Sequence, residues 1–289
     1  MTTDSPYTLR LPQRRDTAVI FSSPHSGRDY PVAMMGRSLL DDRLIRSSED
    51  AFVDQLYDSA PDQGAPLIAA RAARAFIDLN RAPDELDPAV IEGVLRAPHN
   101  PRVSSGLGVI PRVVANGRAI YRGKIPLAEA QDRIARYWQP YHDALRALID
   151  DNCARFGAAI LIDAHSMPHE AIETHTRPGQ PRPDVVLGDR FGAAADRWVV
   201  EAVESAFAEA GLRVARNMPF AGAYIAQAYG RPSRRQHVVQ VEVDRALYMD
   251  ETRIEPRPDF AAFRALMAGV VARIAAAGRG ATTLPLAAE

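Results

Sequence analysis

The sequence AAILIDAHSMP, residues 158–168, joins an apolar run directly to a cluster of polar side chains. Its first five residues are apolar and include branched side chains, which is typical of a strand buried on both faces of a sheet. Asp163, His165 and Ser166 follow within four positions, so we expect the strand to end where this cluster begins. Because open α/β sheets bind ligands at the carboxyl ends of their strands, this cluster is expected at a binding edge.

Two other apolar runs lead into polar residues in the same way. Residues 18–23 are followed by Pro24-His25-Ser26-Gly27, in which the proline and the glycine force a tight turn that lifts His25 off the strand end. Residues 238–243 contain Glu242, and a carboxylate inside a buried strand is costly unless it is paired or bound. Glu242 could act as a general base near a metal, or form a buried salt bridge with an arginine. We expect the three strand ends to meet and to hold a metal ion.

Predicted strands and helices alternate along the chain. Strands are predicted at residues 18–23, 66–70, 75–79, 158–162, 184–188, 213–215 and 238–243. Helices are predicted from residue 49 and over residues 127–148, 191–207 and 260–274. This alternation indicates an α/β fold with helices on a mostly parallel or mixed central sheet, in three layers. With no linker or internal repeat, residues 1–289 are predicted to form a single catalytic domain.

The ends of the chain and one internal segment are predicted to be irregular. Residues 1–16 and 279–289 are expected to be loosely ordered ends. Residues 82–124 have many prolines and glycines and little periodicity, which indicates a long irregular segment that passes over the sheet edge. Long segments of this kind inside a domain usually have a function.

Composition excludes several classes of protein. The 289 residues are 47% hydrophobic and 25% charged, as in an ordinary globular protein, and the net charge of -1 argues against nucleic-acid binding. No run approaches the ~20 apolar residues of a membrane span, and the N-terminal residues lack the apolar core of a signal peptide. We therefore expect a cytoplasmic protein without a membrane partner, and we make no prediction about its oligomeric state.

Two histidines are candidate metal ligands. Neutral imidazole is the commonest zinc ligand, and His25 and His165 each lie at a predicted strand end. Asp163 is close enough to His165 to orient its ring by accepting the second N–H. The third ligand could be Glu49 or Asp50, although both could instead stabilise the start of the predicted helix. A single histidine is more often a structural residue, and the sequence lacks an H-E-x-x-H motif.

Several other residues could bind an anionic substrate. Asn80 and Arg81 end a predicted strand at the same edge, and arginine forks onto a carboxylate through two parallel hydrogen bonds. Arg112 and Arg231 lie in the irregular stretches and could make the pocket suitable for a dicarboxylate. Tyr224 could hydrogen-bond the substrate or only pack against its neighbours. Each arginine alone is more often a solvated surface residue.

Taken together, the motifs resemble the N-formylglutamate amidohydrolase family. The segments, between about Ser22 and Glu251, are SSPHSGRDYP, EDAFVDQLYD, FIDLNR, GLGVIPR, LIDAHSMP, DVVLGD, PFAGAYI and VVQVEVDRALYMDE. The combination is specific, although no single segment would be. The resemblance implies a zinc-carboxypeptidase and aspartoacylase type of fold, with an α/β core and a mixed sheet, as in phosphorylase/hydrolase-like domains.

The resemblance also implies a zinc site with one Zn²⁺ per chain. Its ligands would be His25, His165 and an acid near Asp50. The carboxypeptidase pattern has a glutamate ligand three residues after the first histidine, and here that position is Arg28. The acidic ligand must therefore come from elsewhere in the chain, and we choose Asp50 over Glu49.

The activity implied is hydrolysis of N-formyl-L-glutamate to formate and L-glutamate, a step of histidine degradation. Glu242 falls at the position of the general base, and Asn80 and Arg81 fall where aspartoacylases bind the substrate carboxylate. With Arg112, Arg81 would hold the glutamate carboxylates. The alternatives are a zinc deacylase of another N-acyl amino acid or of a γ-glutamyl peptide, and a non-catalytic protein that binds an anion.

Overall fold

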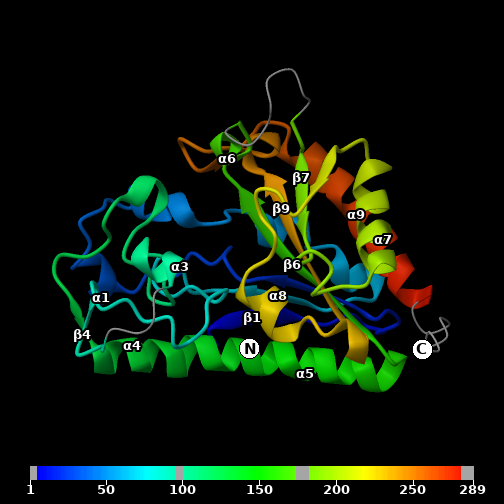
Figure 1. The fold of residues 1–289 in the computed structure, drawn as a ribbon. Coiled ribbons are helices and arrows are strands. Elements are labelled where there is room, and N and C mark those ends of the chain that lie inside the picture. Colours follow the sequence, from blue (N-terminus) through cyan, green and yellow to red (C-terminus); the bar gives the residue numbers. More distant parts are fainter. Residues whose placement is uncertain (1–4, 96–99, 174–181, 281–289) are drawn as a thin grey trace.

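A seven-stranded mixed sheet forms the centre of the molecule (Figure 1). The computed structural model describes residues 5–95, 100–173 and 182–280. Within these residues the sheet has the strand order β1-β3-β2-β6-β9-β7-β8, and four of its six pairings are parallel. Its strands are β1 (Tyr7–Arg10), β2 (Val19–Ser23), β3 (Leu67–Ala70), β6 (Ala159–Met167), β7 (Val185–Gly188), β8 (Val214–Arg216) and β9 (Gln236–Asp244). The predicted α/β class with a mixed sheet is confirmed.

The other elements surround this sheet. Two small pairs of strands are β4 (Ile91–Glu92) with β5 (Ile125–Pro126), and β10 (Met249–Asp250) with β11 (Glu255–Pro256). The α-helices are α1 (Val32–Met35), α2 (Val53–Leu56), α3 (Pro101–Ser104), α4 (Leu127–Arg133), α5 (Gln139–Phe156), α6 (His169–Glu173), α7 (Arg197–Ala208), α8 (Tyr224–Tyr229) and α9 (Phe260–Gly280). The 3₁₀ turns are η1 (Leu44–Ser48), η2 (Ala60–Gln63), η3 (Ala115–Gly117), η5 (Pro232–Arg234) and η6 (Arg245–Leu247), and a π-helical turn, η4 (Ile134–Trp138), joins α4 to α5.

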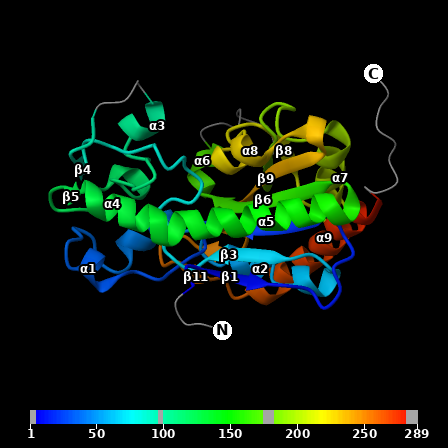
Figure 2. The same cartoon turned by 90° about the horizontal axis from the view of Figure 1, so that it is seen from below.

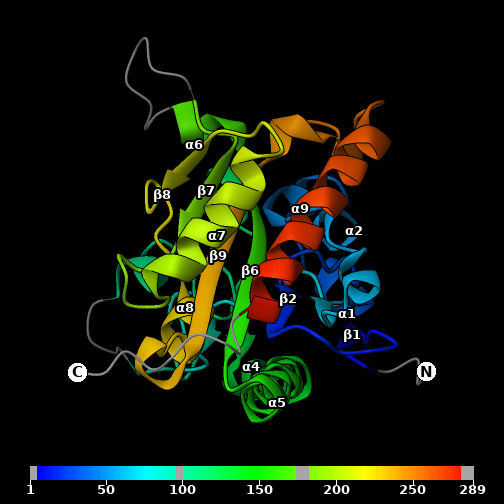
Figure 3. The ribbon, with the colours of Figure 1, turned by 90° about the vertical axis from the view of Figure 1, so that its right-hand side faces the viewer.

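Alternating side chains of the strands build one hydrophobic core on each face of the sheet. On β6, Ile160 and Ile162 face the core formed with α2, α7 and α9. Ala159 and Leu161 point the other way, toward the core that contains α5 and the irregular segments. Figure 2 shows α4 and α5 as one long rod, and Figure 3 shows α7 and α9 packed side by side. The result is the predicted three-layer arrangement.

The central strand is longer than the sequence pattern predicts, and this places the polar cluster. β6 continues through Asp163, His165 and Ser166 and pairs with β9 over nine residues. The prediction that the strand ends at Ile162 is therefore wrong. Because side chains alternate, Asp163 and His165 lie on the same face as Leu161, where the apolar core gives way to polar residues. The site is built on the second half of the strand.

Three other predictions about local structure are wrong. Residues 7–10 form the edge strand β1, antiparallel to β3, although a loosely ordered arm was expected. Residues 75–79 form turns, because the Ala73 carbonyl accepts hydrogen bonds from the amides of Phe76 and Ile77. No helix begins at residue 49, since Phe52 has a left-handed backbone (φ 66°) and α2 starts only after it. Residues 281–289 of the predicted loose C-terminus lie outside the described part.

The segment 82–124 and the helix α9 were also the subject of predictions. The described parts of residues 82–124 are largely irregular, as expected, and hold only short elements such as α3 and η3. By length and composition alone, α9 could cross a membrane, contrary to the expectation that no such run exists. It packs on α7 and η2, and its face with Met267 and Val270 belongs to the core, which is ordinary for the helix of a globular layer.

Candidate active site

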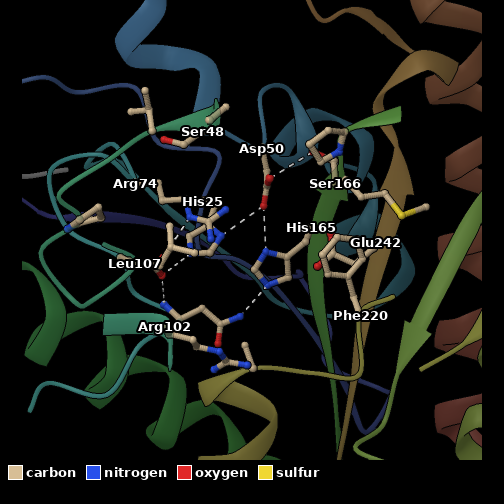
Figure 4. A pocket seen from close by; sticks show the side chains of 18 of the residues that line it. His25, Ser48, Asp50, Arg74, Arg102, Leu107, His165, Ser166, Phe220 and Glu242 are labelled. Atoms are coloured by element: carbon tan, nitrogen blue, oxygen red, sulfur yellow. Dashed lines mark hydrogen bonds and ion pairs between the residues drawn. The ribbon is translucent and has the colours of Figure 1, made fainter. Parts of the chain in front are cut away.

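Three buried side chains from distant parts of the chain meet at the carboxyl edge of the sheet. His25, Asp50 and His165 each offer one ligand atom, and these atoms lie within 4.8 Å of one another (Figure 4). Oδ2 of Asp50 is 2.9 Å from Nδ1 of His165 and 3.3 Å from Nδ1 of His25. The two ring centroids are 4.8 Å apart. The structure thus brings together the three residues proposed as metal ligands.

Local backbone geometry brings each of these residues to the site. His25 lies in the turn after β2, and this turn packs tightly against the next loop, because a Cβ at Gly27 would be 2.2 Å from the Ala72 carbonyl oxygen. His165 extends from β6. Asp50 lies between η1 and α2, and its amide donates a hydrogen bond of 3.0 Å to the His25 carbonyl. Backbone contact therefore fixes two of the three candidate ligands, His25 and Asp50, relative to each other.

Carboxylates orient both imidazole rings. Nε2 of His25 is 2.7 Å from Oδ1 of Asp78, and Nε2 of His165 is 3.1 Å from Oδ2 of Asp163. Such contacts are typical of metal-binding histidines, because they fix the tautomer and raise the basicity of the other nitrogen. Nδ1 of His25 is buried and has no hydrogen-bond partner among the described residues. A cation at the centre would give this nitrogen a partner.

The charges around Asp50 also favour a cation at the centre. Burial raises the pKa of Asp50, but the hydrogen bond with His165 and the nearby His25 imidazole outweigh it and hold this pKa well below the usual range. Burial lowers the pKa of His165, but Asp163 and then Asp50 raise it well above its ordinary value. The cluster therefore stabilises positive charge between its members. A divalent metal ion can replace that proton, because metal binding releases protons from its ligands.

A second set of contacts holds the other oxygen of Asp50. Nη2 of Arg245 donates to Oδ1 of Asp50 at 2.9 Å, and the Ser166 hydroxyl lies 3.3 Å from the same oxygen. Nε of Arg245 donates to the Ser166 hydroxyl at 3.1 Å. With Oδ1 engaged in this way, Oδ2 is the oxygen that faces the two histidines.

The structure distinguishes the two acids that the sequence left open. Glu49 accepts a hydrogen bond of 2.6 Å from the Tyr30 hydroxyl and forms an ion pair of 3.1 Å with Arg46. It is not part of the histidine cluster, whereas Asp50 is. Successive residues in this extended stretch point in different directions, so only one of the two can reach the centre.

Glu242 lies beside the cluster on β9. It is paired in register with His165 of β6, and it lines the cavity described below. Nε2 of Gln240 donates a hydrogen bond of 2.7 Å to Oε1 of Glu242. Burial raises the pKa of Glu242 to about 7. Within the described chain no arginine forms an ion pair with it, so the salt-bridge alternative lacks support.

A cavity of about 540 Å³ opens onto these residues. In the view of Figure 4, His25, Asp50 and His165 lie at its centre, with Glu242 and Phe220 to one side. Segments 102–117 and 219–223 contribute to its walls. Four arginines also line it: Arg74, Arg81, Arg102 and Arg245. A cavity with this concentration of cations suits a small anionic ligand.

Asn80 and Arg81 line the cavity as predicted, although they lie in a loop and not at a strand end. The Asn80 amide nitrogen is 3.2 Å from Oδ2 of Asp163, and its oxygen accepts a hydrogen bond of 2.7 Å from the Ile225 amide. Arg81 donates from Nε to the Leu107 carbonyl and from Nη1 to the Asn80 carbonyl, at 2.9 and 2.8 Å. Both side chains are therefore rigidly placed.

Two other predicted substrate residues are not among those that line the cavity. Arg112 donates to Oδ2 of Asp87 at 2.8 Å and to the Ser104 carbonyl at 3.2 Å. The Tyr224 ring packs against Trp138, with centroids 5.8 Å apart. Arg112 is engaged by a partially buried ion pair, which explains why it points away from the cavity.

Sequence reasoning did not assign Arg74, Asp78, Arg102, Gln240 and Arg245 to the site, although all five line the cavity. Asp78 and Arg245 stand inside motifs that already carry predicted site residues, FIDLNR and VVQVEVDR. Gln240 could have been found from its spacing, because it precedes Glu242 by two positions and so shares its face of the strand. Nothing in the sequence signals Arg102, since its place depends on the path of an irregular segment.

Comparisons with known proteins identify relatives of this chain. The family model of N-formylglutamate amidohydrolase matches residues 17–249. The chain is 32% identical to an N-formylglutamate deformylase of Pseudomonas putida, over 81% of this chain and 82% of that protein. It is also 32% identical to an N-formylglutamate deformylase of Pseudomonas aeruginosa, over 83% and 85% of the two chains.

Solved structures show the same relationship. The crystal structure of an N-formylglutamate amidohydrolase from Ralstonia eutropha JMP134 superimposes with a TM-score of 0.88 and 36% identity, covering 95% of this chain and 99% of that one. The gene product Atu2144 from Agrobacterium tumefaciens has a TM-score of 0.60 at 16% identity, over 92% and 94% of the two chains, which shows a shared fold. On the family match and the identity to these relatives, the chain belongs to the N-formylglutamate amidohydrolase family.

Proposed function

We propose that this chain hydrolyses N-formyl-L-glutamate to formate and L-glutamate. Membership of the family and the chain's likeness to two N-formylglutamate deformylases support this reaction. The observation that carries the proposal is the meeting of three metal-ligating atoms with Glu242 at the floor of an arginine-lined cavity. A role in histidine degradation and a cytoplasmic location, without nucleic-acid or membrane partners, remain predictions from the sequence.

We propose Zn²⁺, one per chain, as the metal. Two imidazole nitrogens and one carboxylate oxygen are a common ligand set for a catalytic zinc with an open position, and His25, His165 and Asp50 supply them. A zinc ion bound there supplies a Lewis acid that polarises the formyl oxygen and makes water more acidic. The same ligand set also suits other divalent ions, so elemental analysis identifies the metal.

Glu242 is proposed to move the proton. Its carboxylate takes a proton from the water that attacks the formyl carbon, and gives it to the amide nitrogen as the C–N bond breaks. These steps yield formate and the free amine of glutamate. The hydrogen bond from Gln240 occupies Oε1, which leaves Oε2 to exchange the proton. A pKa raised to about 7 by burial suits a group that must both accept and release a proton near neutral pH.

Arg81 is proposed to bind the α-carboxylate of the substrate. Its Nε and Nη1 are fixed by backbone carbonyls, and Nη2 makes no hydrogen bond to any other described residue. A guanidinium held in this way can bind a carboxylate with little loss of side-chain entropy. Asn80, whose side-chain amide is already engaged by Asp163 and by the Ile225 backbone amide, serves to hold Asp163 in place rather than to bind substrate.

Formate release from a panel of N-acyl amino acids tests the function. The purified holoenzyme should show its highest kcat/KM with N-formyl-L-glutamate, below which N-acetyl-L-glutamate and γ-glutamyl amides should fall. A chelator should abolish turnover, and added Zn²⁺ should restore it. A higher kcat/KM on another member of the panel would indicate a different deacylase. Tight glutamate binding without turnover of any member would instead indicate a non-catalytic protein.

A further inference from the structure

The four arginines that line the cavity fall into two classes. Two of them form ion pairs with buried acids, Arg74 with Asp78 at 3.0 Å and Arg245 with Asp50 at 2.9 Å. The other two, Arg81 and Arg102, form no ion pair with a carboxylate among the described residues. The site therefore presents two guanidinium groups that have no direct carboxylate partner among the described residues. A ligand with two carboxylates would match them.

The two unpaired arginines belong to one connected unit. The Arg102 carbonyl accepts a hydrogen bond of 2.8 Å from the Leu107 amide, and the Leu107 carbonyl accepts one of 2.9 Å from Nε of Arg81. Figure 4 shows Arg102 and Leu107 near each other at the cavity. Burial lowers the pKa of the Arg81 guanidinium, the charge of Asp78 opposes this shift, and the charges of Arg74 and then Arg102 add to it. The positive charges of Arg81 and Arg102 are thus close enough to interact electrostatically.

The segment that carries Arg102 is held at both ends. At its start, Oδ1 of Asn100 caps α3 by accepting hydrogen bonds from the amides of Arg102 and Val103, at 2.9 and 3.4 Å. At its end, Nη2 of Arg112 donates to the Ser104 carbonyl at 3.2 Å. This contact gives Arg112 a structural role, which is to support the helix that carries Arg102.

The two arginines stand at different depths. Arg81 is 7% exposed and adjoins Asn80, whose amide nitrogen lies 3.0 Å from Nε2 of His165. Arg102 is exposed, at the rim of the cavity. In an N-acyl glutamate the α-carboxylate is attached to the carbon that bears the reacting nitrogen, whereas the side-chain carboxylate lies further from it. The reacting bond at the metal centre therefore places the α-carboxylate near the deep arginine and directs the side chain toward the rim.

We infer that Arg102 binds the side-chain carboxylate of the substrate and so makes the enzyme selective for N-acyl amino dicarboxylates. This inference rests on the proposed function, because it assumes that the amide is cleaved beside Glu242. It assigns the second carboxylate to a residue of α3 in place of Arg112. Selectivity for a charged side chain then depends on a single guanidinium at the rim.

A comparison of N-formyl-L-glutamate with N-formyl-L-glutamine tests this assignment, because the two substrates have nearly the same shape and differ in one charge. Arg102→Gln should lower kcat/KM for the glutamate substrate about 10- to 100-fold, chiefly through KM, because it removes a charge-assisted hydrogen bond. It should change the glutamine substrate little, so the selectivity ratio should collapse. Arg102→Lys should recover part of it. Arg118 is an exposed arginine of the same irregular segment, 82–124, and it does not line the cavity. Arg118→Gln should therefore leave the ratio unchanged.

The outcomes separate this inference from the proposed function. Formate release by the wild type, with an unchanged selectivity ratio in Arg102→Gln, would overturn the role of Arg102 and leave the function intact. A wild type that releases no formate would overturn the function. In that case calorimetric binding of L-glutamate and L-glutamine to the same proteins decides the question, and an equal preference in wild type and Arg102→Gln would refute the role of Arg102.

Discussion

The candidate site has two halves that are built differently. One half lies on neighbouring strands, where His165 on β6 and Glu242 on β9 are fixed by the register of the sheet. The other half lies on loops and on the short helix α3, where hydrogen bonds between side chains and backbone groups hold Asn80, Arg81 and Arg102. The strand half contains the groups proposed for bond cleavage, and the loop half contains those proposed for substrate recognition. His25 and Asp50 connect the halves through the cluster that they form with His165.

This division suggests how the enzyme can change its substrate without losing its chemistry. The hydrogen bonds between strands hold strand residues in fixed positions. A group that transfers a proton over a short distance needs such precise positioning. Loop residues can be exchanged without disturbing the sheet. We therefore expect variants of the strand half to lower kcat, and variants of the loop half to raise KM.

The largest effect is expected for Glu242 on β9, the proposed proton carrier. Glu242→Gln keeps the shape of the side chain but cannot accept the proton, so kcat should fall about 10²- to 10⁴-fold while KM changes little. Steady-state formate release measures both constants, and metal analysis should show an unchanged content. A variant that keeps full kcat would remove Glu242 from the mechanism.

A smaller effect is expected for the carboxylates that orient the two histidines. Asp163→Asn on β6 and Asp78→Asn in the loop should each weaken metal binding about 10- to 100-fold, as measured by competition with a chelator. Asp78→Asn should weaken metal binding more than Asp163→Asn does. Asp78 also accepts hydrogen bonds from the Arg74 guanidinium at 3.0 Å and from the backbone amide of Asn80 at 2.8 Å. Equal metal affinity in both variants and the wild type would mean that the rings do not depend on these contacts.

Arg81 offers a direct comparison of the two halves. Arg81→Gln should raise KM for N-formyl-L-glutamate about 10- to 100-fold, because one charge-assisted contact with the α-carboxylate is lost. The effect on kcat should be much smaller than that of Glu242→Gln. A loss confined to kcat would contradict the division between cleavage and recognition.

The smallest effect on activity is expected for His142, which ties α5 to the loop half. Nε2 of His142 donates to the Leu79 carbonyl and Nδ1 accepts from the Tyr229 hydroxyl, both at 2.8 Å, and the ring stacks on Trp138. Burial lowers the pKa of His142 to about 4. The unfolded chain, with an ordinary histidine pKa of about 6.5, therefore takes up this proton first as the pH falls.

Because the unfolded chain takes up the proton first, lowering the pH destabilises the folded protein. The contribution of neutral His142 is fully present above about pH 6.5 and is lost as the pH falls toward about 4, up to about 3 kcal/mol. Urea unfolding at pH 7, 6 and 5 should show that His142→Phe is less stable at pH 7 but loses less stability on acidification. Parallel pH profiles for the two proteins would show that His142 does not titrate in this window.

The sequence predicts the strand half of the site better than the loop half, for physical reasons. Buried strands leave continuous apolar runs, so β2, β6 and β9 could be located, and the polar residues in or after them marked His25, His165 and Glu242. The pattern predicts the end of β6 too early, because the polar residues Asp163 and His165 indicate the end of a buried strand. Only one face of the strand becomes polar there, and the backbone of β6 continues to pair with β9.

The loop half depends on the path of the chain in three dimensions. Arg81 was found through its motif, whereas Arg112 and Arg102 could not be distinguished by residue type, since both are arginines in one irregular segment. The ion pair of Arg112 with Asp87 decides which of them faces the cavity. Likewise, the choice between Glu49 and Asp50 depends on backbone direction, which no local periodicity reports.

Metal content tests the central proposition most directly, because both halves of the site meet at the proposed metal site. Elemental analysis of the purified wild type should find about one divalent ion per chain, zinc by our proposal. His165→Ala should lose it while remaining folded by circular dichroism, and Glu242→Gln should retain it. A folded wild type that binds no divalent ion even after addition of Zn²⁺, or a His165→Ala variant that binds it as tightly, would contradict the account.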